Sequence, residues 1–193
     1  MKTTYLLPLI LILFTVTTIS CKMNSKEETT PETVAETTTE VALDENGVPI
    51  IVGIQKRMAL ETAPYDTWFK SAYKEHTLDT VTINSIKQDL AQTDITVYMG
   101  TWCEDSQRET PAFYKILDLA GIEANTIKLI TVSEDKDTPD GLEKGMNITN
   151  VPTIILSKKG EELGRIVEYP IESLEKDIAK ILSGEEYKHA YAE

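Results

Sequence analysis

The chain has 193 residues, of which 41% are hydrophobic and 26% are charged, a composition typical of one globular domain with added segments. Its 19 Lys and Arg side chains stand against 32 Asp and Glu side chains, giving a formal net charge of −13. This acidity excludes nucleic acid as an expected partner, because binding to phosphates needs a basic surface.

The N-terminal residues form a targeting segment. Lys2 supplies a positive charge, and residues 6–14 form an apolar run that is too short to span a bilayer comfortably. The sequence TISC, which ends at Cys21, resembles the lipobox of bacterial lipoproteins, although Thr18 stands where that motif usually has Leu. An ordinary cleaved signal peptide with a chance cysteine is the alternative. We expect residues 1–20 to be a signal peptide and Cys21 to carry a lipid that anchors the protein in the bacterial cell envelope, periplasmic or surface-exposed.

The next segment, residues 22–47, holds six Thr, six Glu and no aromatic residue. Such a composition buries too little apolar surface to fold, so residues 21–47 are predicted to be a lipidated cysteine followed by a disordered stalk. Lipidation of Cys21 leaves Cys103 as the only thiol, which excludes an internal disulfide. Because the envelope is oxidising, an idle exposed thiol is a liability there, so Cys103 is expected to be used or deeply buried.

Residues 48–79 are interpreted as an N-terminal extension that packs on the main domain. A β-like run covers residues 48–54, and residues 64–75 have a helical pattern. This helix carries an aromatic group formed by Trp68, Phe69 and Tyr73. We interpret these side chains as packing on the domain, and the alternative is that they line a substrate groove. A second helix is predicted over residues 79–90, with its apolar face formed by Val81, Ile83, Ile86 and Leu90.

The main domain is predicted over residues 80–183, followed by a polar tail at 184–193. Four strands are expected, at residues 95–99, 126–132, 152–157 and 163–169. Helices are expected at residues 104–120, 140–148 and 171–182. The first two strands are joined through a helix and should be parallel, whereas the last two form an antiparallel hairpin. The fold class is therefore α/β, with a mixed central sheet flanked by helices.

The candidate reactive group is Cys103, which follows Trp102 at the junction between a strand and a helix. The dipole and free N–H groups of a helix N-terminus favour a thiolate, the reactive form of cysteine. Pro152 lies 49 residues later in the sequence Val151-Pro152-Thr153. Together with Pro111, these motifs resemble the thioredoxin superfamily over residues 80–183, in particular its membrane-tethered envelope members. The resemblance implies a thioredoxin-like fold.

The same resemblance implies roles for these residues. Cys103 would be the nucleophile, with Trp102 beside it. The Val151–Pro152 bond would be cis, and a client backbone would lie in a groove along Val151, Pro152 and Thr153. No cofactor and no metal ion are implied.

Three positions depart from the family pattern. Ser106 replaces the second thiol, Val97 replaces a buried acid, and Glu104 and Asp105 add charges that oppose thiolate formation. A hydroxyl cannot release a client by attacking a mixed disulfide, but Ser106 can donate a hydrogen bond to the Cys103 thiolate. The expected chemistry is exchange, isomerisation or deglutathionylation, completed by the client's own second cysteine or by an external low-molecular-weight or protein thiol.

A second hypothesis is a catalytically degenerate binding module for envelope proteins. The missing second thiol and the missing acid favour the module, and the retained Trp102, Cys103 and Pro152 favour the enzyme. In either case the partners are client proteins, and the clients of the enzyme would carry thiols or disulfides.

Two other candidate sites are weaker. His76 could act as a base, but a surface or core role is preferred. The carboxylates at residues 133–140 lack the spacing of a calcium-binding loop.

Overall fold

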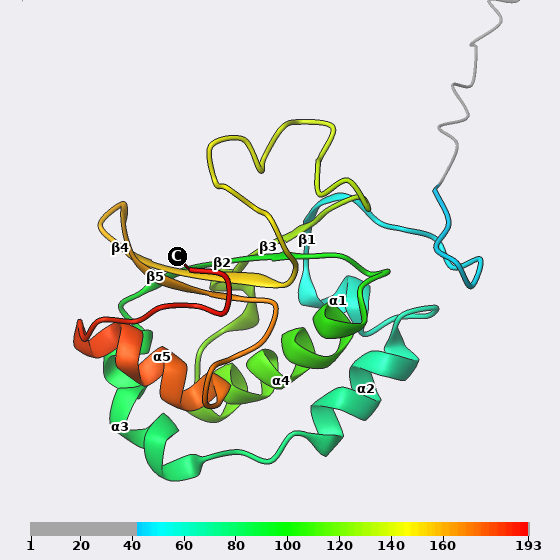
Figure 1. Cartoon of the computed structure of the whole chain (residues 1–193). Helices are drawn as coiled ribbons and strands as arrows, with labels where there is room; N and C mark the ends of the chain where they lie inside the picture. Colours follow the sequence, from blue (N-terminus) through cyan, green and yellow to red (C-terminus); the bar gives the residue numbers. More distant parts are fainter. Residues whose placement is uncertain (1–41, 193) are drawn as a thin grey trace, which may run out of the picture. The chain divides into compact units, whose positions relative to one another are not determined.

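The computed structural model describes residues 42–192 (Figure 1). The expected signal peptide, Cys21 and residues 22–41 of the expected stalk lie outside the described residues. The last part of the expected stalk, residues 42–47, forms a turn in which Asp44 Oδ1 accepts the Asn46 and Val48 N–H groups at 2.9 and 2.8 Å. No helix within residues 42–192 has the length and apolar character needed to cross a membrane.

A five-stranded mixed sheet forms the centre of the domain, in the order β1-β3-β2-β4-β5. The strands are β1 (Gly53–Gln55), β2 (Asp94–Met99), β3 (Lys128–Thr131), β4 (Thr153–Lys158) and β5 (Glu161–Val167). Strands β2 and β3 are parallel, and β4 and β5 form an antiparallel hairpin. The sequence predictions for the mixed sheet and for these two pairings are confirmed.

The helices gather on one face of this sheet (Figure 1). They are α1 (Arg57–Leu60), α2 (Asp66–Glu75), α3 (Thr80–Leu90), α4 (Glu104–Ala120) and α5 (Leu174–Ser183), with a short 3₁₀ helix, η1, at Ala124–Thr126. Because side chains alternate along a strand, Val97 and Met99 of β2 point into a large apolar cluster with these helices. Helix α4 begins and ends where the sequence predicts. Gly121 closes it in a left-handed conformation that glycine adopts without strain.

The expected extension supplies part of the sheet itself. Strand β1 pairs antiparallel with β3, and α2 packs along α4. Phe69 of α2 is buried against Tyr73 and Tyr114, with ring centroids 6.2 Å apart in both pairs. The aromatic group of α2 therefore packs on the domain, as interpreted from the sequence.

Two details of the sequence prediction are wrong. Val81 does not belong to the buried face of α3, since its side chain is 79% exposed. Residues 140–148 form turns instead of a helix, because Gly141 and Gly145 adopt positive φ angles of 66° and 78°. Two left-handed residues four positions apart interrupt the repeating dihedral angles that a right-handed helix requires.

Among residues 42–192, turns and extended segments therefore cover the other face of the sheet, and no helix does. A small buried cluster there contains Tyr98, Ile130, Val132, Val151 and Ile155. Leu142, Met146 and Ile148, from the turns at 140–148, pack against it, and the Tyr98 hydroxyl donates to Leu142 O at 2.8 Å. We call this side the loop face and the opposite side the helix face. Cys103 and Trp102 also pack against the loop-face cluster.

Candidate active site

Cys103 occupies the N-cap position of α4, immediately before its first helical residue. Its backbone is extended, its carbonyl accepts the Gln107 N–H at 2.9 Å, and its side chain caps no helix N–H group. The side chain is partly exposed, and the thiol donates to Val151 O at 3.1 Å. The structure thus brings Cys103 to Val151, 48 positions away, at a helix end that favours negative charge on sulfur.

The segment that faces the thiol is held from both sides. The Val151–Pro152 bond is cis, as the family resemblance implied. Pro152 O accepts the Glu168 N–H at 2.7 Å, and the Thr153 hydroxyl donates to Asn150 O at 2.7 Å. Among the described residues, no hydrogen bond uses the Val151 N–H. The Val151 N–H beside the thiol is therefore a donor without a protein partner in this part of the chain.

The Trp102 indole lies against Gly100 and reaches the residue that follows β3. Its N–H donates to Val132 O at 3.1 Å, and the Lys136 ammonium lies 5.9 Å from the ring centroid. A Cβ atom at Gly100 would lie 2.5 Å from the indole, so only glycine leaves room for this ring position. Gly100, Val132 and Lys136 were not identified from the sequence, and Gly100 alone has a local signal, as a glycine between a strand and the candidate nucleophile.

Ser106 is fully buried, and its hydroxyl oxygen accepts the Gly100 N–H at 3.2 Å. No hydrogen bond joins Ser106 to Cys103 among the described residues. In this state, with the thiol bonded to Val151 O, the hydroxyl braces the loop that carries Cys103. A hydroxyl both accepts and donates, so the bond from Gly100 leaves its proton for a further acceptor.

The two carboxylates after Cys103 differ in their surroundings. Glu104 is exposed, whereas Asp105 forms an ion pair with Arg108. Arg108 also pairs with Glu109 at 2.7 Å. The Asp105 charge, which the sequence analysis expected to oppose a thiolate, is therefore partly offset. Val97, at the position of the missing acid, is fully buried in the helix-face cluster.

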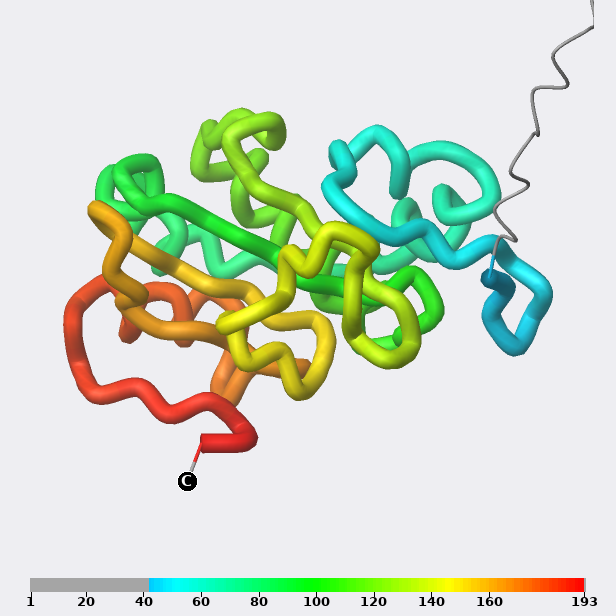
Figure 2. Tube along the Cα trace, turned by 90° about the horizontal axis from the view of Figure 1, so that it is seen from above, coloured from blue at the N-terminus to red at the C-terminus, as the bar shows by residue number. Residues whose placement is uncertain are grey.

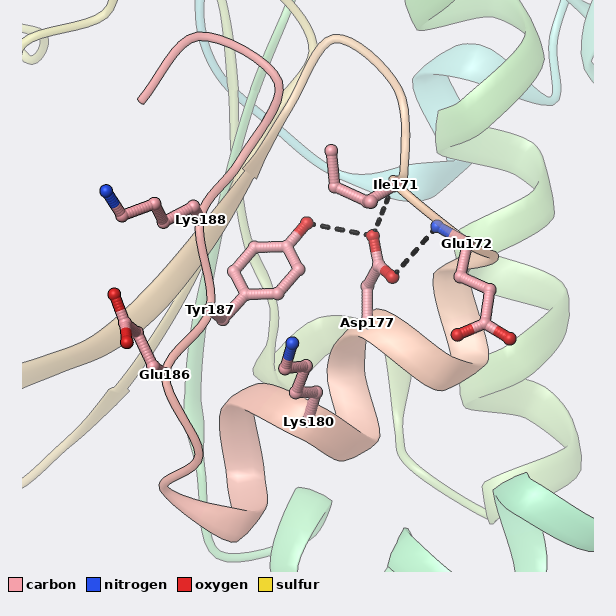
Figure 3. Close-up of a pocket in the computed structure, with 7 residues that line it drawn as sticks. All are labelled: Ile171, Glu172, Asp177, Lys180, Glu186, Tyr187 and Lys188. Carbon is pink, nitrogen blue, oxygen red and sulfur yellow. Dashed lines mark hydrogen bonds between the residues drawn. The ribbon is translucent and has the colours of Figure 1, made fainter. Parts of the chain in front are cut away.

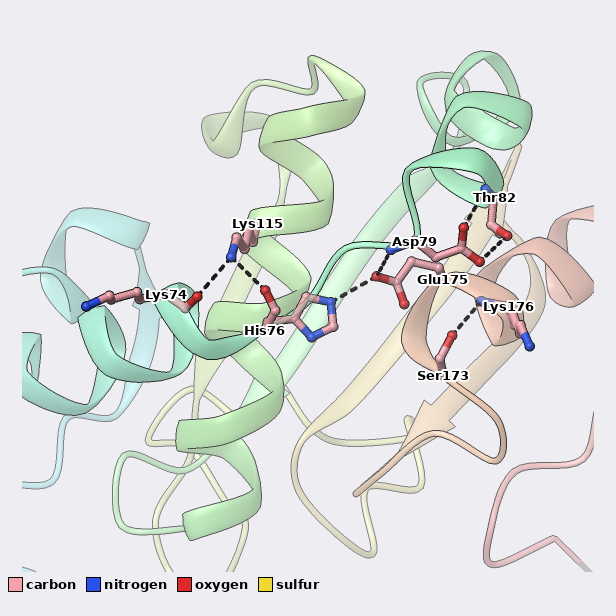
Figure 4. Close-up of polar contacts among 8 residues, drawn as sticks. All are labelled: Lys74, His76, Asp79, Thr82, Lys115, Ser173, Glu175 and Lys176. Atoms are coloured by element: carbon pink, nitrogen blue, oxygen red, sulfur yellow. Dashed lines mark hydrogen bonds and ion pairs between the residues drawn. The ribbon is translucent and has the colours of Figure 1, made fainter.

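His76 takes part in a different network (Figure 4). Its Nε2 lies 2.9 Å from Glu175 Oε1, which also accepts the Asp79 N–H at 3.3 Å, and Lys115 Nζ donates to His76 O at 2.6 Å. Burial raises the pKa of Glu175, but the hydrogen bonds from His76 and the backbone outweigh it and hold that pKa below its ordinary value. These contacts join the α2–α3 connection to α4 and α5, and none of them involves Cys103.

The acidic run at 133–140 is a turn-rich loop. Ser133 N–H donates to Asp137 O at 3.1 Å, and Lys136 N–H donates to Ser133 O at 2.9 Å. Within residues 42–192, no group of three or more His, Cys, Asp or Glu side chains is placed to hold a metal ion.

Comparisons with known proteins show that the chain is similar to thioredoxins. A family model described as "Thioredoxin" matches residues 51–180, which include β1, α1 and α2. Thioredoxin H2 from Arabidopsis thaliana is 29% identical over 84 residues, which make up 44% of this chain and 59% of that relative. The match therefore spans less than two thirds of the relative's length.

Two solved structures are also similar. A protein of unknown function from Pseudomonas aeruginosa is 17% identical, with a TM-score of 0.47, over 68% of this chain and 83% of that one. The oxidized form of mitochondrial thioredoxin 3 from Saccharomyces cerevisiae is 25% identical, with a TM-score of 0.30, over 50% of this chain and 86% of that one.

Proposed function

Because the chain belongs to the thioredoxin family, we propose that it is a thiol-disulfide oxidoreductase that acts through one nucleophilic cysteine, Cys103. The observation that carries the proposal is the position of this thiol. It is partly exposed at the N-terminus of α4, and its Sγ lies 3.1 Å from the carbonyl of the residue before Pro152.

The chemistry is an exchange of sulfur partners. The Cys103 thiolate attacks one sulfur of a client disulfide, a bond forms between these sulfurs, and the client's other sulfur leaves as a thiolate with the electron pair. An external thiolate, or the client's own second thiolate, then attacks the mixed disulfide and releases Cys103. When a different thiolate of the client attacks the client sulfur of the mixed disulfide, a new client disulfide forms and Cys103 leaves as a thiolate, so the client is rearranged without net oxidation or reduction. When the partner is a glutathionylated client, the same steps remove glutathione.

Ser106 makes this a single-thiol mechanism. It stands where the family has its second cysteine, and a hydroxyl does not displace a disulfide sulfur. We assign it to thiolate stabilisation: once the Cys103 proton has left, the buried hydroxyl turns its own proton toward the sulfur while its oxygen keeps the Gly100 N–H.

The client groove uses the backbone around Pro152. The unpaired Val151 N–H lies beside the thiol, where it would donate to a carbonyl of an extended client chain. Trp102 and Thr153 form the sides of this groove in our proposal. Clients with thiols or disulfides and an external thiol are the partners that this chemistry needs.

One observation favours the alternative, a binding module without turnover. The Cys103 thiol donates to Val151 O, so deprotonation would place two electron-rich atoms face to face unless the sulfur moves. A chain that holds clients in the groove without reacting would retain this hydrogen bond.

A membrane anchor at Cys21 in the bacterial cell envelope is the second part of the proposal. It is supported by the apolar run and TISC sequence at the N-terminus. The test is a Cys21→Ala variant, which should take up no labelled fatty acid and should move from the membrane fraction to the soluble fraction. Equal membrane retention of the variant, with an unlabelled wild type, would contradict the anchor.

The exchange proposal is tested on the full chain carrying Cys21→Ala, so that Cys103 is the only thiol. Incubation with oxidised envelope proteins should give long-lived mixed disulfides that glutathione dissolves and that are missing in Cys103→Ala. Ser106→Cys should restore a second thiol and raise disulfide reduction of insulin well above the parent level. If no adduct can be trapped and Cys103 alkylates no faster than free cysteine at pH 7, the exchange proposal is wrong and the binding-module alternative is supported.

A further inference from the structure

The C-terminal segment 187–192 is fixed to the domain by one buried carboxylate (Figure 3). Asp177 of α5 is 3% exposed, and it accepts the Tyr187 hydroxyl at 2.8 Å. The same carboxylate accepts the Ile171 and Glu172 N–H groups of the β5–α5 connection. Buried polar groups are costly when unpaired, so these three donors make the attachment of Tyr187 specific. The segment expected to be a polar tail is therefore docked on the domain.

From Tyr187 the segment runs beside β5 toward the loop that contains residues 147–149 (Figure 2). Its Tyr191 ring meets Tyr169 in an edge-on contact, with centroids 6.3 Å apart and planes at 62°. Both rings remain accessible, at 46% and 44% exposed. A hollow of about 280 Å³ lies between the segment and the domain. Its lining consists of Asn147, Thr149, Arg165 and Val167 from the domain and His189, Tyr191 and Ala192 from the segment.

The chain itself links this hollow to the candidate active site, although none of the residues that line the hollow belongs to that site. Thr149 precedes Val151 by two residues, and Val151 O accepts the Cys103 thiol. On the other side, Tyr169 follows Glu168, whose N–H donates to Pro152 O at 2.7 Å. The two segments that border Pro152 therefore lead directly to the hollow and to the aromatic pair of Tyr169 and Tyr191.

The ionisable side chains that line the hollow, Arg165 and His189, are ion-paired and neutral, respectively. Arg165 forms two hydrogen bonds of 2.6 Å with the Glu162 carboxylate and a third, of 2.7 Å, with Met146 O. Burial, with the positive charge of Arg165, holds the pKa of His189 below its ordinary value, so the neutral imidazole predominates at neutral pH. An uncharged side chain fits this site better than a charged one, and the Tyr191 ring in the lining, with Tyr169 in contact behind it, favours an aromatic one.

We propose that segment 187–192 forms the outer wall of the client groove and that the hollow beside it receives an aromatic side chain of an extended client segment bound at Cys103. The inference rests on the proposed exchange at Cys103. Thr149 in the lining of the hollow is two positions from Val151, so in an extended client that runs beside this segment we expect the aromatic residue at least two positions from the client cysteine.

The test uses the full chain with Cys21→Ala and a set of cysteine peptides activated as mixed disulfides with 5-thio-2-nitrobenzoate. The Cys103 thiolate attacks the peptide sulfur, and coloured thionitrobenzoate leaves with the electron pair, so the colour reports the rate. Phe is placed two, three or four positions before or after the cysteine, and Ala takes its place in the matched peptide. Each rate is divided by the rate of the same variant with 5,5′-dithiobis(2-nitrobenzoate).

The parent should prefer Phe to Ala by about five- to twentyfold at its best position, because part of the ring leaves water. Tyr191→Ala should lower that preference to less than about twofold, and Tyr191→Phe should retain it, because the ring remains. A parent that shows no preference at any position, or a Tyr191→Ala variant that keeps the preference, would overturn the inference. Dimerisation of the parent that Tyr191→Ala abolishes would also overturn it, since a second copy then occupies the site. If Cys103 reacts with neither peptides nor the small disulfide, the exchange proposal itself fails.

Discussion

The two faces of the central sheet are covered in different ways. On the helix face, α2, α3, α4 and α5 bury a large apolar cluster. On the loop face, turns and extended segments cover a cluster of five buried residues, and Cys103 and Trp102 pack at its margin. The difference separates two tasks, because the helices supply most of the buried area while the thiol that we propose as the nucleophile lies where turns and extended segments form the cover.

The largest change in stability is expected for a substitution on the helix face. Phe113 of α4 is fully buried, and Phe113→Ala should lower the free energy of unfolding by ~3–5 kcal/mol through lost burial and the cavity left behind. Leu119 lies on the same helix but is 42% exposed, so Leu119→Ala should change stability by less than ~0.5 kcal/mol. Urea unfolding measures both, and equal losses would show that α4 does not anchor the cluster as described.

The next effect concerns the ionic contact on the helix face. Glu175→Gln should cost ~2 kcal/mol at neutral pH, because the buried carboxylate loses charge-assisted bonds from His76 and Asp79. Its folded pKa is lowered, so this stability is fully present above the unfolded value of about 4.3 and is lost as the pH falls through the folded value.

The gap between wild type and Glu175→Gln should therefore close in acid, as measured by urea unfolding across pH. Glu172→Gln, which breaks an exposed pair with Lys176, is the matched control and should cost ~0–1 kcal/mol. A gap that stays constant from pH 7 to acid would contradict the assigned role of the charge.

A smaller effect sharpens the comparison from the loop face. Tyr98→Phe removes the hydroxyl that donates to Leu142 O and should cost ~1 kcal/mol in global stability. Its larger consequence should be local, with faster hydrogen exchange confined to residues 133–150. Phe113→Ala, by contrast, should accelerate exchange throughout the sheet. Uniform acceleration by Tyr98→Phe would mean that the loop opens only with the whole domain.

The smallest expected effect concerns charge beside the thiol. Lys136→Met removes the cation that lies over Trp102 and should lower the rate ratio of Cys103 alkylation by iodoacetate to that by iodoacetamide about two- to threefold. Lys159→Met, in the turn after β4, is the matched control and should leave the ratio unchanged. An equal ratio in the parent, Lys136→Met and Lys159→Met would show that the Lys136 charge does not affect the reaction of the Cys103 thiolate. Cys21→Ala is present in each.

Most of the fold could be predicted from the sequence because its signals are local. The β-branched run of β2 and the apolar spacing of α4 identify both elements. Residues 140–148 were mistaken for a helix because Gly141 and Gly145 were not recognised as left-handed turn residues. Val81 was assigned to a buried face because the direction of α3 relative to α4 and α5 is a tertiary property that one helix pattern does not contain.

The candidate site was predictable only where a motif marks it. Cys103 and Pro152 were found through their spacing, and the structure places Val151 O against the thiol. The bond between Ser106 and Gly100 was missed because it depends on how the β2–α4 loop folds back. Lys136 and Tyr191 carry no local signal at all, since their partners, Trp102 and Tyr169, are distant in the sequence.

The placement of the two tryptophans, the only two in the chain, gives each face an optical label. Trp68 packs against the helix-face cluster, and Trp102 packs against the loop-face cluster next to Cys103. The tryptophan emission of a Trp68→Phe protein would come from the loop face alone, so it would report changes at the neighbouring sulfur in the proposed exchange. The complementary Trp102→Phe protein would report the integrity of the helical layer, and the pair would allow both layers to be followed separately in one unfolding experiment.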